Sequence, residues 1–180
     1  MATARRSRQD LRDMVALSLG AALVFTLQVA LQALPNIETC SLLFVLFARR
    51  FGWKTFGMVA VFNLLEGVYY TFEPSWWIPY WYVWPLLVCI GILFRKQKSP
   101  LFWAPVLGAF GLIFGTLTSI PYLFMYSVPI AVARWLNGIS FDLLHAAGNF
   151  AIALVLFVPL DRVFDRLGYG IMPPRKSSED

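Results

Sequence analysis

The chain is poor in the groups that enzymes use for catalysis and metal binding. Its 180 residues include one histidine and two cysteines, and only 14% are charged. Cys40 and Cys89 stand far apart inside apolar runs and form no CxxC pair, so we interpret both as small apolar side chains. A metal site needs several His, Cys or carboxylate ligands at short spacing, and the sequence shows no such set. It therefore predicts neither a metal site nor a cofactor.

Familiar catalytic and nucleotide-binding motifs are missing as well. The sequence has no GxSxG, no HExxH and no other pattern that pairs a nucleophile with a base. It also lacks the phosphate-binding loop GxxxxGKS or GxxxxGKT. We therefore expect that the protein is not an enzyme and that it hydrolyses no ATP itself.

Apolar residues are what the chain has in excess. Hydrophobic residues make up 59% of it, and the mean hydropathy is +0.66. A soluble domain of this size could not bury so much apolar surface. We therefore expect an all-α integral membrane protein in a lipid bilayer, with a membrane domain over 11–167, a flexible basic segment at 1–10 and a disordered tail at 168–180. The apolar run Met14–Leu34 is longer than the core of a signal peptide, so cleavage is not expected.

The basic residues predict the topology. Fourteen of the fifteen Lys and Arg lie in four clusters, and two apolar segments separate each cluster from the next. Short loops rich in Lys and Arg stay on the cytoplasmic side. The pattern predicts six transmembrane helices with both termini in the cytoplasm, and it explains the net charge of +5 without binding to nucleic acid. The clusters are Arg5–Arg12, Arg49–Lys54, Arg95–Lys98 and Arg162–Lys176.

The apolar runs predict helices near 11–34, 40–48, 54–72, 76–94, 101–124 and 140–160. The second run is short, because spanning a bilayer takes about twenty residues. Either this helix extends through snorkelling Arg49 and Arg50 to Trp53, or the break at Pro35–Glu38 dips into the membrane. We expect 125–139 to form an outer lid or re-entrant connection, and Ser140 to cap the last helix.

An unusual concentration of aromatic residues lies between two apolar runs. Nine of the sixteen residues in Tyr69–Trp84 are aromatic. Adjacent helices could hold an acid and an amide on one wall and a row of flat rings on the other, which would suit a small, flat, polar molecule. The alternative is an aromatic belt at the membrane interface. At helical spacing the first wall has Asn63, Glu66 and Tyr70, and the second has Trp77, Tyr80, Trp81 and Trp84.

Polar side chains also mark one face of the last predicted helix. Asp142, His145 and Asn149 are spaced i, i+3, i+7. An ionisable group inside a membrane helix costs roughly 2.5–3.5 kcal/mol, so it is usually paired or functional. Glu66 and His145 both fall near the outer ends of their helices, which predicts one cavity open to the exterior.

Each of these polar groups also has a purely structural interpretation. Asp142 could pair with Arg134 and anchor the outer connection. His145 could serve only in packing. Asn63 and Asn149 could join neighbouring helices, as amides often do in membranes.

The strings LPNIE at Leu34–Glu38, EGVYY at Glu66–Tyr70 and FDLLHAAGNF at Phe141–Phe150 suggest a family. Together with the size and the predicted topology, they resemble the substrate-binding S components of energy-coupling factor (ECF) vitamin transporters. The resemblance implies a subunit of a bacterial cytoplasmic membrane that captures a vitamin or similar micronutrient from outside. It also implies docking on a transmembrane coupling subunit driven by two ATPase subunits.

The resemblance further implies which residues would act. Ligand contacts in the family come from outer loops and from the later helices, which here would include Asn36, Glu38, Trp77, Tyr80, Trp81, Trp84, Arg134, Trp135, Asp142, His145 and Asn149. Docking in the family often uses an AAxxxA motif on the first helix. This chain has Ala21 and Ala22 but Thr26 in the last position, within a stripe of small residues that includes Ser18.

Two other functions remain open at this level. One is a small intramembrane enzyme that uses Glu66, Asp142 and His145 as acid and base. The other is a structural membrane subunit whose polar groups pair internally. If the protein binds a ligand, the aromatic row favours a planar heterocycle and the acids favour hydrogen-bond donors or positive charge. Thiamine-like, pyridoxine-like and macrocyclic vitamins all fit, whereas a single outer arginine disfavours a strongly phosphorylated ligand.

Overall fold

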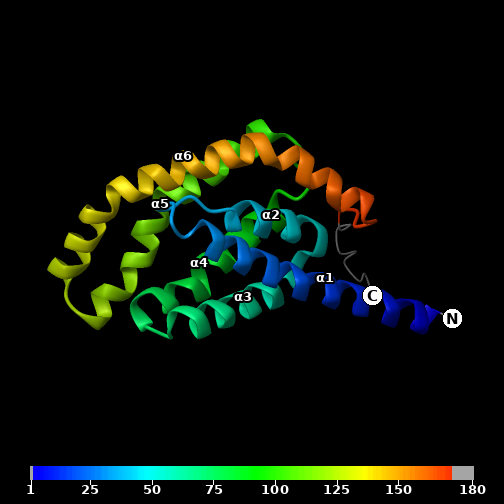
Figure 1. Ribbon diagram of the computed structural model, residues 1–180, viewed down its shortest axis with the longest axis horizontal. Helices are drawn as coiled ribbons and strands as arrows, with labels where there is room; N and C mark the ends of the chain where they lie inside the picture. The colour runs from blue at the N-terminus through cyan, green and yellow to red at the C-terminus, as the bar shows by residue number, and fades with distance from the viewer. Residues whose placement is uncertain (1, 172–180) are drawn as a thin grey trace, which may run out of the picture.

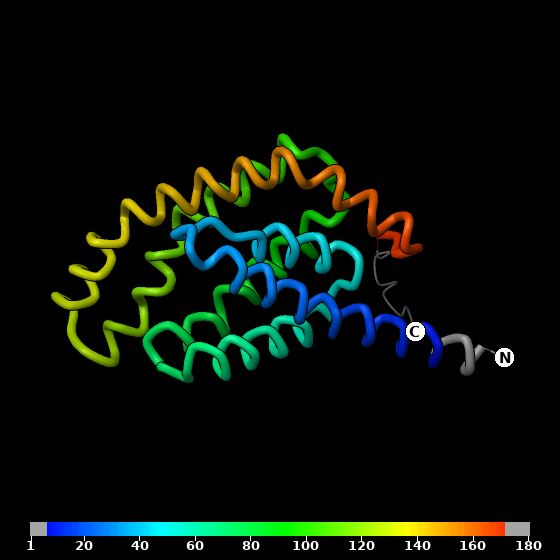
Figure 2. The backbone as a smooth tube through the Cα atoms, viewed as in Figure 1, coloured from blue at the N-terminus to red at the C-terminus, as the bar shows by residue number. Residues whose placement is uncertain are grey.

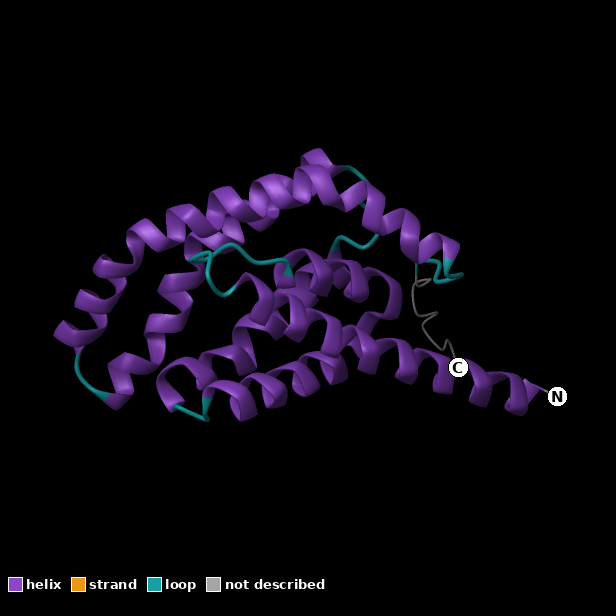
Figure 3. Ribbon diagram, in the orientation of Figure 1, coloured by secondary structure: helices purple, strands orange, loops and turns teal. Residues whose placement is uncertain are grey.

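The computed structural model describes the backbone of residues 2–171 and the side chains of residues 7–171. This part of the chain forms helices and no strands (Figure 3), which confirms the all-α prediction for it. The tail predicted at 168–180 lies outside the described residues from 172 onward. In chain order the elements are α1 (Ala2–Leu31), α2 (Cys40–Phe51), the short 3-10 helix η1 (Gly52–Lys54), α3 (Thr55–Tyr70), α4 (Pro74–Leu93), α5 (Pro100–Met125) and α6 (Val128–Arg166), as Figure 1 shows.

The protein is an α-helical membrane protein. Among the described residues, four helices are long and apolar enough to cross a bilayer. They are the Ser7–Leu31 part of α1 and the whole of α4, α5 and α6. The other two are shorter, with 12 residues in α2 and 16 in α3. At 1.5 Å per residue they measure about 18 and 24 Å, less than the ~30 Å of the hydrocarbon core.

Helix α2 forms the centre of the bundle, and all twelve of its residues are buried. Its Phe44 ring lies 5.3 Å from the rings of both Phe62 in α3 and Trp84 in α4. The helix does extend through Arg49 and Arg50, as one of the two expectations had it. Both guanidinium groups are buried, however, so they do not snorkel to the surface.

The basic clusters meet at one end of the molecule. Arg49 Nη1 lies 2.6 Å from Asp161 Oδ1 of α6, and Arg49 Nε donates to the carbonyl of Arg95 after α4. Arg50 binds both Asp161 and Asp165 of α6. The N-terminal part of α1 and the end of α6 lie toward this same end, as Figure 1 shows.

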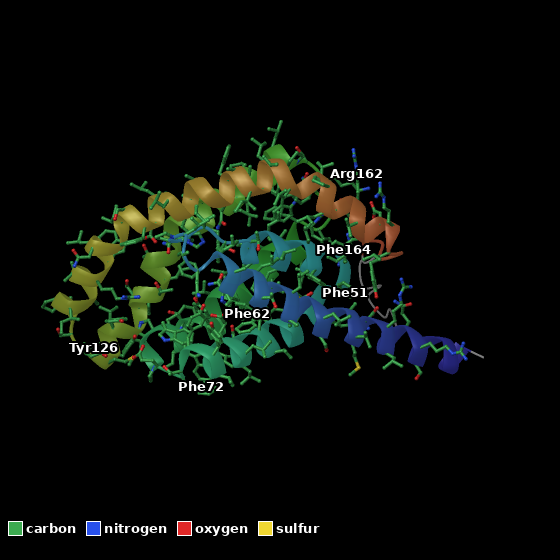
Figure 4. All side chains as sticks on the ribbon, in the orientation of Figure 1. Phe51, Phe62, Phe72, Tyr126, Arg162 and Phe164 are labelled. Atoms are coloured by element: carbon green, nitrogen blue, oxygen red, sulfur yellow. The ribbon has the colours of Figure 1, made fainter. Side chains whose placement is uncertain are left out.

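Further contacts fasten α1 at this basic end. Lys54 Nζ lies 2.7 Å from Asp10 and 2.8 Å from Asp13, and these hydrogen bonds raise the pKa of the Lys54 ammonium. Arg12 donates to the carbonyl of Leu167 and stacks over Tyr169. In Figure 4, the labelled Phe51 and Phe164 lie near this end, and Phe72 and Tyr126 lie near the opposite one.

The lid or re-entrant connection predicted at 125–139 is wrong. Helix α5 continues to Met125, α6 begins at Val128, and Ser140 lies inside α6 and does not cap it. Pro129 is tolerated because it falls in the first turn. Gly138 has little helix propensity, yet the helix continues through it, and Trp135 just before it donates to Thr116 of α5. The tip of the α5–α6 pair projects beyond the other helices (Figure 2).

Smaller differences concern helix ends. Helix α1 begins at Ala2, before the predicted start at Leu11, and ends at Leu31, before the predicted Leu34. Helix α4 begins at Pro74, where Glu73 accepts hydrogen bonds from the hydroxyl and the amide of Ser75. These bonds lower the pKa of the Glu73 carboxyl group.

Candidate functional site

The α1–α2 loop, residues 32–39, closes the end of the bundle opposite the basic clusters. Asn36 adopts a positive φ of 55°, which few residues other than glycine accept, and its Nδ2 donates to the carbonyl of Phe141 at 2.9 Å. Beside it, Ile37 fills a notch at Gly148, where an added Cβ would lie 2.7 Å from the Ile37 Cδ1. The loop is thus fitted to the polar face of α6.

Glu38 anchors a buried polar network under this loop. Its carboxylate accepts hydrogen bonds from the Ser41 amide at 2.8 Å and the Ser41 hydroxyl at 2.5 Å. The Nε2 atom of His145 lies 3.1 Å from the same carboxylate, and Asn149 Nδ2 donates to Ser41 Oγ at 3.2 Å. The structure thus brings Glu38 of the loop together with His145 and Asn149, which the sequence placed on one face of the last helix.

Asp142 has a different partner from the one considered in the sequence. Its carboxylate accepts a hydrogen bond from the Gly115 amide of α5 at 2.9 Å, and a Cβ at Gly115 would overlap it. Among the described side chains Asp142 makes no ion pair with Arg134, whose guanidinium lies over the Tyr122 ring at 4.5 Å. Trp135 is partly exposed and donates to Thr116. The anchoring ion pair is therefore absent from this part of the chain.

The first predicted wall, on α3, joins both α4 and the loop. Asn63 Nδ2 donates to the Tyr80 carbonyl at 3.1 Å, and Trp77 Nε1 donates to the Asn63 carbonyl at 2.8 Å. The Tyr70 hydroxyl donates to Gln32 at 2.8 Å. Glu66 is only 2% exposed, and its Oε1 has no hydrogen-bond partner.

The aromatic row on α4 divides into two pairs. Tyr80 and Trp84 pack edge to face at 5.5 Å, and Trp84 is buried. Trp77 and Trp81 form the other pair at 5.4 Å, and Trp81 is 39% exposed. Of the two pairs, only Tyr80 and Trp84 line the loop pocket described below. Residues i and i+4 on a helix, such as Tyr80 and Trp84, point in directions about 40° apart around its axis, whereas Trp81 points about 100° away from Tyr80.

Two polar pockets adjoin at this end. The first, which we call the loop pocket, has a volume of about 270 Å³. The second, the α5–α6 pocket, has about 230 Å³, and the two share Asn36 and Phe114. The remaining lining of the loop pocket comprises Gln28, Leu31, Gln32, Leu34, Pro35, Ile37, Glu38, Tyr80, Trp84 and His145. That of the α5–α6 pocket comprises Gly115, Thr118, Ser119, Arg134, Gly138, Phe141 and Asp142.

A larger apolar groove of about 600 Å³ lies at the basic end, between α1, α2 and α6. Apart from Arg8 and Arg12 on α1, nearly all of its lining is apolar, so it offers a polar ligand few partners. None of the predicted substrate-binding residues lines it. The loop pocket is therefore the better candidate for a small polar molecule.

Several polar atoms around the loop pocket are buried without a partner. Such an atom costs roughly 1–3 kcal/mol, so native proteins keep few of them. Two of these atoms, Trp84 Nε1 and His145 Nδ1, belong to residues that line the pocket. The others near this end are Thr39 Oγ1, Asn63 Oδ1 and Glu66 Oε1.

The sequence missed some of the lining residues. Gln28 and Gln32 lie one turn apart at the end of an apolar helix, and that spacing was a usable signal. Phe114 offered no such signal, because nothing distinguishes it from the other phenylalanines of α5. Among the described residues no group of three or more His, Cys, Asp or Glu could hold a metal ion.

The predicted docking residues on α1 fall into two environments. Ala21 is fully buried, so it belongs to the core. Ser18, Ala22 and Thr26 are exposed along one face, and the Thr26 hydroxyl donates to the Ala22 carbonyl at 2.8 Å. Three small residues thus remain available on the surface of α1.

Fold and site together define an α-helical membrane protein with a polar, aromatic-lined pocket closed by a loop at one end. Comparison of the chain with known protein families, with curated proteins and with solved structures finds no match.

Proposed function

We propose that the protein is the substrate-capture subunit of an ECF-type importer, which binds a vitamin-like micronutrient outside a bacterial cytoplasmic membrane. It would cross that membrane six times with both termini in the cytoplasm. The observation that carries the proposal is the loop pocket, in which Glu38, His145 and the rings of Tyr80, Trp84 and Phe114 surround a space bordered by unpartnered polar atoms. A ligand with complementary groups would satisfy those atoms.

The loop itself supports capture from one side. Its attachment to α6 depends on one Asn36 hydrogen bond, the Glu38–His145 contact and the seating of Ile37. Few contacts of this kind allow a loop to open and close at modest free-energy cost. The pocket lies at the end opposite the basic residues, which is the outer end if the positive-inside rule holds.

Delivery inward would need a partner, because the chain contains no nucleotide-binding loop. The exposed stripe of Ser18, Ala22 and Thr26 lets another helix approach α1 closely. Under the proposal a transmembrane coupling subunit docks there, and two ATPase subunits supply the energy. Replacing Ala22 with Phe should prevent this assembly and leave ligand binding intact.

The direct test is mass spectrometry of small molecules that co-purify with the protein in lipid nanodiscs, followed by binding measurements with the compound found. Trp84→Leu should lower its affinity at least tenfold, because Trp84 lines the pocket. Trp81→Leu is the matched control and should not, because Trp81 lies outside the pocket. Equal effects of the two variants, or no bound compound, would contradict the proposal.

An acid–base function is the second candidate, and one contact favours it. Glu38 and His145 lie 3.1 Å apart in the pocket, the arrangement of a carboxylate that orients a general base. If the purified protein converted the bound compound into a product, the enzyme would be the better interpretation. Recovery of the unchanged compound after prolonged incubation would favour capture.

A further inference from the structure

The loop pocket limits the size of its ligand. Its volume of about 270 Å³ falls just below the roughly 300–1,000 Å³ typical of pockets for drug-sized molecules. Asn36 and Phe114 stand between it and the neighbouring pocket of about 230 Å³. A single small ring system fits in the loop pocket, and one substituent could extend into the α5–α6 pocket, whereas a macrocycle does not fit.

The unpartnered atoms limit the hydrogen bonding of the ligand. His145 Nε2 faces the Glu38 carboxylate and donates to it, and in the tautomer with its single proton on Nε2 the Nδ1 atom is an acceptor. The Glu38 carboxylate also lines the pocket as an acceptor, and Trp84 Nε1 is a donor. These three groups complement a ligand that is rich in donors and has one acceptor.

The charges around the pocket favour a cation. Glu38 lines the pocket and is 7% exposed, whereas Glu66 lies outside the lining and is 2% exposed. Asp142 lies in the neighbouring pocket, where Arg134 is turned onto Tyr122. Because buried carboxylates repel an anion strongly, an acidic ligand would be excluded.

The rings favour a flat molecule. Phe114 lies 5.5 Å from Trp84 and 4.8 Å from the His145 ring, and 6.5 Å from Tyr80. Aromatic faces attract both flat rings and positive charge.

We propose that the loop pocket binds a small, flat nitrogen heterocycle that bears an amino or ammonium group. Its N–H donors meet acceptors such as His145 Nδ1, and a ring nitrogen or hydroxyl accepts from Trp84. This assignment rests on the proposed capture function and names its substrate class. It excludes macrocyclic and carboxylate-bearing ligands.

The test compares compounds that differ in one group, using calorimetry on the ligand-free protein in nanodiscs. Pyridoxamine, pyridoxine and 4-pyridoxic acid carry an ammonium, a hydroxyl and a carboxylate on the same ring. We expect pyridoxamine to bind at least tenfold more tightly than pyridoxine. We also expect no binding of 4-pyridoxic acid, biotin or cyanocobalamin.

Two variants connect this preference to the site. Glu38→Gln should reduce the preference for the amino compound, because the Glu38 carboxylate lines the pocket and its negative charge is lost. The matched control Glu73→Gln makes the same charge change at the start of α4, outside both pockets, and should leave the preference unchanged. If the folded Glu38→Gln variant leaves the preference unchanged, the assignment of charge selection to this site is wrong.

Failure of the ligand class can be distinguished from failure of the function. Tight binding of biotin, 4-pyridoxic acid or cyanocobalamin would overturn the ligand class and leave the capture function standing. So would co-purification of a compound without an amino or ammonium group. If neither the probes nor any co-purified compound binds, both proposals are wrong.

Discussion

At the scale of single residues, Glu66 shows the conflict between stability and binding most clearly. Its carboxylate is almost fully buried, with one oxygen unpartnered. Replacing it with methionine removes that buried polar group and should raise the free energy of unfolding of the ligand-free protein by about 1–3 kcal/mol. The same change should weaken ligand binding. Thermal unfolding in detergent and calorimetry measure the two effects.

Glu38 provides the contrast, because its carboxylate is fully engaged with Ser41 and His145. Glu38→Met should therefore lower the free energy of unfolding. If Glu66→Met proved as destabilising as Glu38→Met, the Glu66 carboxylate would have a partner that the structure does not show.

Among the acidic residues of the basic end, Asp161 is the one whose replacement should cost the most stability. It pairs with Arg49 and Arg50, and its side chain is 13% exposed, whereas that of Asp165 is 60% exposed. Asp161→Asn leaves the buried Arg49 guanidinium without its charge partner and should cost about 3 kcal/mol. Asp165→Asn, the matched control, should cost about 1 kcal/mol or less. Equal losses on thermal unfolding would mean that the Asp161 pair is as hydrated as the Asp165 pair.

The residue scale also shows how far the sequence could predict the site. The spacing of His145 and Asn149 placed them on one face of a helix, and the structure agrees. Their partners Glu38 and Ser41 come from about a hundred residues earlier, so helical periodicity could not reveal that contact. Helical periodicity could not reveal the division of the aromatic row into two pairs either. Burial of Trp84 and exposure of Trp81 depend on where α2 and α5 pack, which no local pattern contains.

At the scale of helices, α5 and α6 depend on glycines at their interface. A Cβ at Gly111 would lie 2.8 Å from backbone atoms of His145 and Ala146, so the two helices would have to separate. Gly111→Ala should therefore destabilise the protein by about 1–3 kcal/mol and, because His145 moves, lower ligand affinity. Gly138→Ala is the control in α6. It has open space around its Cβ and should stabilise the helix by about 0.5–1 kcal/mol. Thermal unfolding measures both effects, and an unchanged or raised midpoint for Gly111→Ala would contradict the close packing at Gly111.

Helices followed the apolar runs closely, since each run is bounded by proline, glycine or charged residues. The exception at 125–139 is instructive. Proline, arginine and an Asn-Gly pair suggested a loop, but tertiary packing against α5 outweighs those local signals. The Arg134 guanidinium lies over the Tyr122 ring of α5.

At the scale of the whole molecule, the two ends differ in chemistry. Four contacts gather basic residues at one end, and the loop pocket lies at the other. A lipid bilayer would then meet an apolar body between a basic end and a polar pocket. The positive-inside rule assigns the basic end to the cytoplasm, and that assignment can be tested by accessibility.

Cysteine labelling tests the orientation with two single sites. In a background where Cys40 and Cys89 are replaced by alanine, Tyr126→Cys places a thiol at the α5–α6 turn and Ser99→Cys places one before α5. Both native side chains are exposed. A membrane-impermeant maleimide added to intact cells should label position 126 and leave position 99 unlabelled until the cells are lysed, because a charged reagent does not cross the hydrocarbon layer. Labelling at position 99 alone would place the loop pocket inside the cell, where it could not capture a nutrient from outside.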